Sequence, residues 1–197
     1  MIPCYKSIKL LTDKVFALAL LFLFSPLMLF IALVVYMEQH RIFFIQTRPG
    51  YLGTPFRMYK FSTMDNDRDK PDIERITLLG FWLRKLSLDE LPQLWNILKG
   101  EMSFIGPRPF LMEYLPLYSK HHMQRHLVMP GITGLAQVTG KNNVGWTEKL
   151  DMDVYYTRHI NFFLDVKIVL LTINYFIRGC PGSYPATKFA GYYSDRH

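Results

Sequence analysis

An uncharged run near the N-terminus constrains this chain more than any other feature. From Val15 to Met37 the sequence reads VFALALLFLFSPLMLFIALVVYM and contains no Asp, Glu, Lys or Arg. At about 1.5 Å per residue, a helix over this run is long enough to cross a hydrocarbon core of about 30 Å. A cleaved signal peptide is disfavoured, because the run is too long and no small-x-small cleavage site follows it. We therefore predict a membrane segment.

Ser25 and Pro26 lie near the middle of this run. Proline has no backbone N–H and clashes with the preceding turn, so we expect the helix to kink there. Basic residues flank the run on both sides, which suits two cytoplasmic ends: Lys6, Lys9 and Lys14 before it, and His40, Arg41 and Arg48 after it. The residues alone leave two alternatives open, a kinked helix that crosses the bilayer and a re-entrant helix that turns back.

The amino-acid composition excludes some classes of protein and indicates the kind of partner. Hydrophobic residues make up 50% of the chain and aromatic residues 15%, which excludes a disordered protein. The net charge of +7 indicates an anionic partner, either nucleic acid, anionic lipid or a phosphorylated substrate. The two cysteines, Cys4 and Cys180, form no CxxC pair, so we predict a reduced, cytosol-facing protein with no zinc site.

The pattern divides the chain into a membrane segment with its basic flank, 1–41, and one cytoplasmic domain, 42–197. The domain opens with two predicted strands, Ile42–Gln46 and Phe56–Phe61, around a turn at Pro49–Thr54. Predicted helices follow at Ile76–Leu86, Leu88–Lys99, Tyr114–His126 and 146–178, the second ended by Gly100 and the last broken near Asn161. The part Phe162–Ile177 suits either a bilayer surface or the core. The expected fold is α+β and mainly helical, with a small β-hairpin.

The densest cluster of reactive residues is Leu83–Pro109, LRKLSLDELPQLWNILKGEMSFIGPRP. Asp89 and Glu90 are adjacent in it, Arg84 precedes them and Arg108 follows. One interpretation is structural, because Ser87 and Glu90 have the spacing of a helix capping box. The other is chemical: a carboxylate there binds Mg²⁺ or attacks phosphorus, while the arginines hold phosphate oxygens.

Three other motifs are weaker. Gly134–Lys141 resembles a P-loop, but its glycine spacing is wrong and Asn142 replaces Ser or Thr. Asp65, Asp67 and Asp69 begin like an EF-hand loop without its glycine, so we expect a solvated loop and keep a metal site there as an alternative. His122 and His126 share a helical face with no acid near them in sequence, and we expect them to be solvated.

Four motifs occur together in a fixed order: Ser25-Pro26, KFSTM at Lys60–Met64, LSLDELPQLWNILKGEMSFIGPRP at Leu86–Pro109, and PGITGLAQVTGK at Pro130–Lys141. In this combination the chain strongly resembles, over nearly its whole length, the bacterial sugar transferases called small monotopic phosphoglycosyl transferases. It is most similar to those that start glycan assembly with an N-acetylated, often diacetamido (bacillosamine-type), sugar phosphate. Ser62 departs from the family pattern, since relatives frequently carry a basic residue there.

The resemblance implies a reaction at the cytoplasmic face of the bacterial inner membrane. A sugar-1-phosphate passes from a UDP-sugar to undecaprenyl phosphate, giving undecaprenyl-diphosphate-sugar and UMP. By this likeness Asp89 is the nucleophile and binds Mg²⁺, and Glu90 is its acidic partner. The matching phosphate-binding positions are Lys60, Arg84 and Arg108. The likeness also implies a monotopic protein with interfacial amphipathic helices, in which Ser25-Pro26 breaks a re-entrant helix.

Two rival functions stay open at this point. A membrane-anchored, metal-dependent glycosyltransferase could use the Asp65–Asp69 cluster, and it would release UDP instead of UMP. A non-enzymatic adaptor could use its basic surface only to bind anionic membrane lipids. Nucleic acid is not an expected partner. The sequence does not fix the sugar, the polyprenyl chain length, the glycan pathway or the oligomeric state, so a homo-oligomer stays open.

Overall fold

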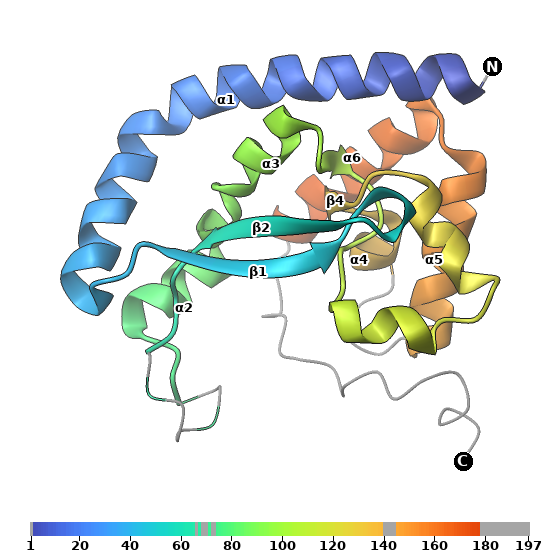
Figure 1. Ribbon diagram of the computed structural model, residues 1–197. Coiled ribbons are helices and arrows are strands. Elements are labelled where there is room, and N and C mark those ends of the chain that lie inside the picture. The colour runs from blue at the N-terminus through green and yellow to red at the C-terminus, as the bar shows by residue number, and fades with distance from the viewer. Residues whose placement is uncertain (1, 66, 68–70, 72–73, 140–144, 178–197) are drawn as a thin grey trace.

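The computed structural model describes residues 2–65, 67, 71, 74–139 and 145–177. Its longest element is α1 (Ile2–Gln39), a helix of 38 residues with Pro26 inside it. Figure 1 shows α1 running along one side of the molecule and then bending sharply toward the strands. Within the described residues α1 is the one helix long and apolar enough to cross a membrane, and only 11% of its most apolar window is buried. These properties agree with the predicted membrane segment.

Both halves of α1 pack on the same globular domain. In the N-terminal half, Ala17 belongs to a core cluster with Leu94 and Ile97. In the C-terminal half, Val35 belongs to another cluster with Phe61. Next to the proline, the Ser25 hydroxyl donates a hydrogen bond of 2.8 Å to the carbonyl of Phe22, a local bond that often accompanies a helix bend.

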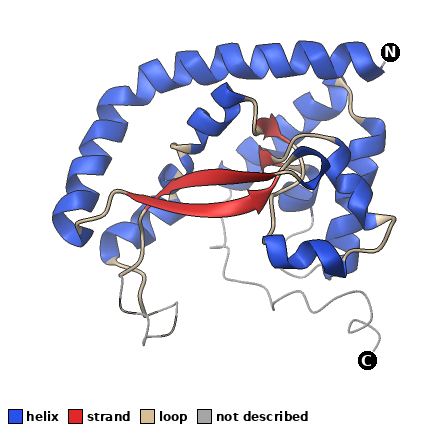
Figure 2. Cartoon of the chain, in the orientation of Figure 1, coloured by secondary structure: helices blue, strands red, loops and turns tan. Residues whose placement is uncertain are grey.

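A β-hairpin follows α1, as the sequence predicts. Strands β1 (Phe43–Pro49) and β2 (Pro55–Phe61) pair antiparallel, with Phe43 opposite Phe61, and the short 3-10 helix η1 (Tyr51–Gly53) joins them. The predicted helix after the hairpin is α2 (Leu78–Lys85). The Thr77 hydroxyl caps α2 by accepting from the amide of Gly80 at 3.0 Å. Figure 2 shows helices around this small amount of strand.

The next segment is not the continuous helix predicted for Leu88–Lys99. It consists of a 3-10 turn, η2 (Leu88–Glu90), and the short helix α3 (Gln93–Lys99). Pro92 stands between them and cannot donate a backbone hydrogen bond, so α3 begins only after it. The predicted end of the helix is confirmed, because Gly100 adopts the left-handed conformation with φ 80°.

Two short parallel strands, β3 (Ser103–Ile105) and β4 (Gly131–Thr133), bring two motifs together. The chain leaves β3 at Gly106 and continues toward Arg108. A Cβ atom on Gly131 would lie 2.1 Å from the backbone nitrogen of Gly106, so only glycine allows this approach. The glycine-rich PGITG segment therefore acts as a backbone support for the chain that carries Arg108.

The helix predicted for Tyr114–His126 is wrong. The structure has two 3-10 segments instead, η3 (Met112–Leu117) and η4 (His122–Leu127), because Pro116 interrupts the backbone ladder and Tyr118 is extended. After α4 (Leu135–Thr139), the helices α5 (Trp146–His159) and α6 (Phe162–Ile177) confirm the predicted break near Asn161. The side-chain oxygen Oδ1 of Asn161 accepts from the amide of Leu164 at 2.9 Å and so caps the start of α6.

Apolar side chains remain exposed on three helices. On α6, Ile168 is buried while Phe163 and Ile177 are about four-fifths exposed (81% and 79%). Phe81 and Trp82 on α2 and Leu86 just after it are exposed, and α1 exposes most of its apolar length. Exposed apolar surface of this extent is typical of a protein that associates with a membrane.

We predict that Gly131→Ala destabilises the domain, because the new methyl group meets backbone atoms that cannot rotate away. Overpacking of this kind costs about 1–3 kcal/mol, measurable as a lower midpoint of thermal unfolding of the purified protein. Gly145→Ala is the matched control, since nothing lies within 4 Å of a Cβ there. Equal midpoints for the two variants would show that the close approach at Gly131 is relieved at no cost.

Candidate active site

The paired carboxylates Asp89 and Glu90 lie on the 3-10 turn η2, not at a capped α-helix. Ser87, which precedes the turn, is in the left-handed conformation with φ 54° and ψ 21°, and its side chain makes no capping hydrogen bond. The Glu90 carboxylate instead faces Lys60 on β2. The capping-box interpretation is therefore wrong, because Ser87 makes no capping hydrogen bond and the Glu90 carboxylate accepts from Lys60.

Glu90 holds two cations from distant parts of the chain. The Lys60 ammonium is 2.6 Å from Glu90 Oε1, and Arg108 Nη2 is 3.3 Å from the same oxygen. Lys60 Nζ also lies 3.9 Å from Asp89 Oδ2. The side chains of Lys60, Asp89 and Glu90 are largely buried. Three separated elements, namely β2, η2 and the chain after β3, thus meet at one cluster of opposite charges.

The pKa values of the two neighbouring carboxyl groups shift in opposite directions. Burial raises the pKa of Asp89 above its ordinary value, and Lys60 offsets this only in part. Burial acts on Glu90 in the same direction, but the charges and hydrogen bonds of Lys60 and Arg108 outweigh it and lower its pKa to about 2. Glu90 is therefore a fixed negative charge at neutral pH, whereas the burial of Asp89 is less fully compensated by nearby cations.

The fifth predicted residue, Arg84, reaches the same region from α2. Its Nε donates a hydrogen bond of 2.8 Å to the Thr63 hydroxyl, and its positive charge lowers the pKa of Asp89. Beside the carboxylates lies a small cavity of about 60 Å³, whose lining includes Lys60, Glu90 and Arg108 together with apolar residues such as Met58 and Phe110. The structure therefore brings all five predicted residues into one region, and three of them face a common cavity.

Two further arginines support the loop of Arg108 and are not apparent from the sequence. The guanidinium of Arg125 on η4 donates a hydrogen bond of 2.6 Å to the Arg108 carbonyl. Arg48 on β1 reaches the Pro109 carbonyl at 3.3 Å. Arg125 is almost fully buried and pairs with Asp153 on α5 at 2.7 Å. Arg125 and Arg48 lie far in sequence from the residues that they contact, so motif spacing does not identify them.

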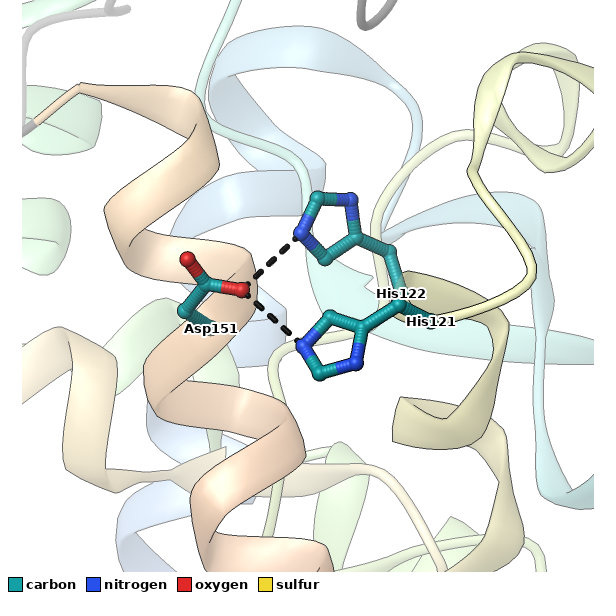
Figure 3. Close-up of side chains that lie close together, drawn as sticks. All are labelled: His121, His122 and Asp151. Carbon is teal, nitrogen blue, oxygen red and sulfur yellow. Dashed lines mark hydrogen bonds and ion pairs between the residues drawn. The ribbon is translucent and has the colours of Figure 1, made fainter.

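The histidines expected to be solvated are buried. His122 is 2% exposed and its Nε2 lies 3.1 Å from Asp151 Oδ1, while His126 is 5% exposed with Nδ1 3.3 Å from the Gly50 carbonyl. Burial and the neighbouring Arg125 lower the pKa of His126 to about 4, which keeps its ring neutral. The expectation failed because these partners are distant in sequence. Figure 3 shows His121 and His122 directed at Asp151.

The two remaining motifs lie partly outside the described residues. The backbone at Asp65 is tied to the chain beyond the loop, since Arg75 donates to the Asp65 carbonyl at 2.9 Å. Asp69 is outside the described residues, so the alternative metal site at Asp65–Asp69 stays untested. The end of the P-loop-like segment, Gly140 and Lys141, is also outside them.

Comparison with known proteins places this chain in a family. A family model described as bacterial sugar transferase matches residues 4–179. The chain belongs to the bacterial sugar transferase family. The uncharacterized sugar transferase EpsL of Bacillus subtilis (strain 168) is 48% identical over 84% of this chain and 85% of its own length. This membership confirms the family predicted from the four motifs.

Two other relatives carry a reaction in their names. The UDP-N-acetylgalactosamine-undecaprenyl-phosphate N-acetylgalactosaminephosphotransferase of Aeromonas hydrophila is 37% identical over 90% of this chain. The UDP-glucose:undecaprenyl-phosphate glucose-1-phosphate transferase of Xanthomonas campestris pv. campestris is 41% identical over 83% of it. The matches cover 45% and 37% of these two relatives, respectively. The names agree with the enzyme class predicted from the sequence, a phosphoglycosyl transferase.

We predict that Arg125→Met destabilises the protein by about 3–5 kcal/mol, because it leaves Asp153 as an uncompensated buried charge. The double variant Arg125→Met/Asp153→Leu should recover most of this lost stability. Sugar-phosphate transfer should be low in both variants, because the Arg108 carbonyl lacks its hydrogen-bond donor in both. Chemical denaturation and turnover, measured on both variants, separate the two effects. Full turnover in the stable double variant would remove Arg125 as a positioning residue.

Proposed function

We propose that this protein transfers a sugar-1-phosphate from a UDP-sugar to undecaprenyl phosphate and releases UMP. The observation that carries the proposal is the pair of adjacent carboxylates, one fixed between two cations and the other with a raised pKa. Both substrates are anionic, so direct attack of one on the other meets charge repulsion. Lys60, Arg84 and Arg108 supply positive charge at this place to offset it.

In the first step, a carboxylate oxygen of Asp89 attacks the phosphorus that bears the sugar. The bond from that phosphorus to the UMP oxygen breaks, and UMP leaves with the bonding electrons. In the second step, an oxygen of undecaprenyl phosphate attacks the same phosphorus and Asp89 leaves as a carboxylate. Two displacements through a covalent intermediate replace one difficult attack between anions.

Asp89 is the residue that fits Mg²⁺. Its carboxylate supplies the hard oxygen ligands that this ion prefers, and Lys60 Nζ at 3.9 Å is too far away to occupy them with a hydrogen bond. Bound Mg²⁺ neutralises charge on a diphosphate. Glu90 is already engaged by Lys60 and Arg108, so we assign it the role of holding those two cations beside Asp89.

An apolar cavity supports a lipid acceptor. It is an open depression of about 300 Å³ between α1 and the hairpin, and it is lined by Ser25, Met28, Ala32, Phe43 and Phe61, among others. Phe61 directly follows Lys60 on β2, and successive strand residues point to opposite sides. The end of β2 therefore lies between the cavity beside the carboxylates and the apolar one. A polyprenyl chain in the second would place its phosphate near the first.

We further propose that α1 is re-entrant and that the domain lies at the cytoplasmic face of the bacterial inner membrane. Lys9 in the first half of α1 pairs with Asp165 of the domain at 2.9 Å, and Val35 in the second half packs on Phe61. A helix whose two halves touch one domain enters and leaves the membrane on the same side. The bend near Pro26 makes this return feasible.

The sugar remains a proposal drawn from the resemblance. We propose an N-acetylated sugar, with a diacetamido sugar as one form of it. The names of the relatives include both N-acetylgalactosamine and glucose, so family membership does not decide between these substrates. UMP release measured across a panel of UDP-sugars, with undecaprenyl phosphate and Mg²⁺, is the experiment that selects the donor.

The covalent step gives a direct prediction. Enzyme incubated with Mg²⁺ and UDP-sugar labelled in the sugar, without lipid acceptor, should become labelled on the peptide containing Leu88–Leu91 and release UMP. Asp89→Asn should carry no label and lose turnover by about 10³-fold or more, because the amide is not a nucleophile. Its fold should survive, since the side-chain shape is kept.

The products and kinetics identify the rival functions. Release of UDP would indicate the glycosyltransferase alternative, and no turnover with any nucleotide sugar would indicate an adaptor. Label on another residue, or strictly sequential kinetics without an adduct, would reject Asp89 as nucleophile. Glu148→Gln is the matched control, because it makes the same carboxylate-to-amide change at an exposed residue on α5 outside the Lys60–Glu90 cluster.

The topology can be tested with single cysteines in a background lacking Cys4 and Cys180. Ser7→Cys and Thr47→Cys lie at exposed positions before and after the apolar run. We predict that a membrane-impermeant maleimide labels neither in intact spheroplasts and both after lysis. A helix that crosses the bilayer would instead expose one of the two cysteines to label from outside.

A further inference from the structure

Two adjacent histidines and an aspartate meet where η4 packs against α5 (Figure 3). Nε2 of His121 and Nε2 of His122 each lie 3.1 Å from the same atom, Asp151 Oδ1. One potential ligand atom of each residue lies within 4.8 Å of those of the other two. The figure shows both rings directed at the carboxylate from the start of η4, and Asp151 on the facing helix. None of these residues belongs to the proposed reaction.

The separations are close to those around a metal ion. In zinc sites, imidazole nitrogens and carboxylate oxygens lie about 2.0–2.2 Å from the ion, so neighbouring ligands of a tetrahedral site are about 3.4 Å apart. The two nitrogen–oxygen separations of 3.1 Å need only a small outward movement to match this value. Two nitrogen ligands favour a transition metal over Mg²⁺ or Ca²⁺, which prefer oxygen ligands alone.

The cluster combines one fixed ligand with two accessible ones. The His122 side chain is 3% exposed, and the His122 amide donates to the Ser119 hydroxyl at 3.2 Å, which fixes the start of η4. His121 and Asp151 are about half exposed, at 47% and 51%. An ion can therefore enter from solvent, and water can complete its coordination.

We propose that His121, His122 and Asp151 bind one divalent transition-metal ion, of which Zn²⁺ is the representative, with water as a further ligand. The ion joins η4 to α5. These two elements also carry Arg125 and Asp153, the pair that supports the Arg108 carbonyl, so the ion stabilises the support behind the active site. The sequence expectation of no zinc site rested on the cysteines, and this ligand set contains none.

The test uses the full chain without a histidine tag, purified in detergent and stripped with a chelator. Equilibrium dialysis against Zn²⁺, with excess Mg²⁺ present to occupy oxygen-only sites, should give about one Zn²⁺ per chain. Asp151→Asn and His121→Ala should weaken binding about tenfold or more, because each removes a direct ligand at a surface position. His159→Ala is the control, an exposed histidine on the same helix that should leave binding unchanged.

A second readout reports on structure. Zn²⁺ should raise the thermal unfolding midpoint of the unmodified chain and of His159→Ala, but not that of Asp151→Asn. If the unmodified chain binds no more Zn²⁺ than Asp151→Asn, the cluster is only a pair of hydrogen bonds and the proposal is wrong. Binding that survives in both ligand variants but disappears in Asp89→Asn would place the ion elsewhere and also overturn it. Neither readout depends on turnover, so the result is independent of the proposed function.

Discussion

The arrangement of the candidate site depends on the burial of Glu90 between Lys60 and Arg108. Removing a carboxylate from water is costly unless cations and hydrogen bonds compensate it, and here two cations meet one oxygen at 2.6 and 3.3 Å. Satisfying Glu90 therefore fixes where β2, η2 and the chain after β3 lie relative to one another. The same contacts place positive charge beside Asp89, whose buried carboxylate is less fully compensated.

A network of polar contacts also fixes the position of α1, the candidate membrane helix, relative to the domain. On α1, Lys9 pairs with Asp165 at 2.9 Å, and Asp13 accepts a hydrogen bond of 2.6 Å from Ser103 at the start of β3. Strand β3 leads within a few residues to Arg108. Strand β3 thus connects α1 to the loop that carries Arg108. A displacement of α1 would act on the position of Arg108 through this strand.

The sequence predicts what local chemistry determines and fails where partners are distant. The hairpin, the end of α3 at Gly100 and the break at Asn161 depend on neighbouring residues, and all three are confirmed. The residues of the candidate site came from motifs, and the structure gathers them. The predictions of a capping box and of solvated histidines were wrong, because both depend on distant partners. Glu90 pairs with Lys60, which is 30 positions away in the sequence, and His122 contacts Asp151, which is 29 positions away.

The geometry of η2 explains how neighbouring carboxylates come to have different surroundings. A 3-10 helix has about three residues per turn, so consecutive side chains point about 120° apart. Glu90 can then face Lys60 and Arg108 while Asp89 points elsewhere, with Lys60 at 3.9 Å. The regular α-helix predicted for Leu88–Lys99 would continue the same ladder through Leu91, but Pro92 ends it. Proline at this position thus favours the tighter turn, on which the carboxylates of Asp89 and Glu90 have different surroundings.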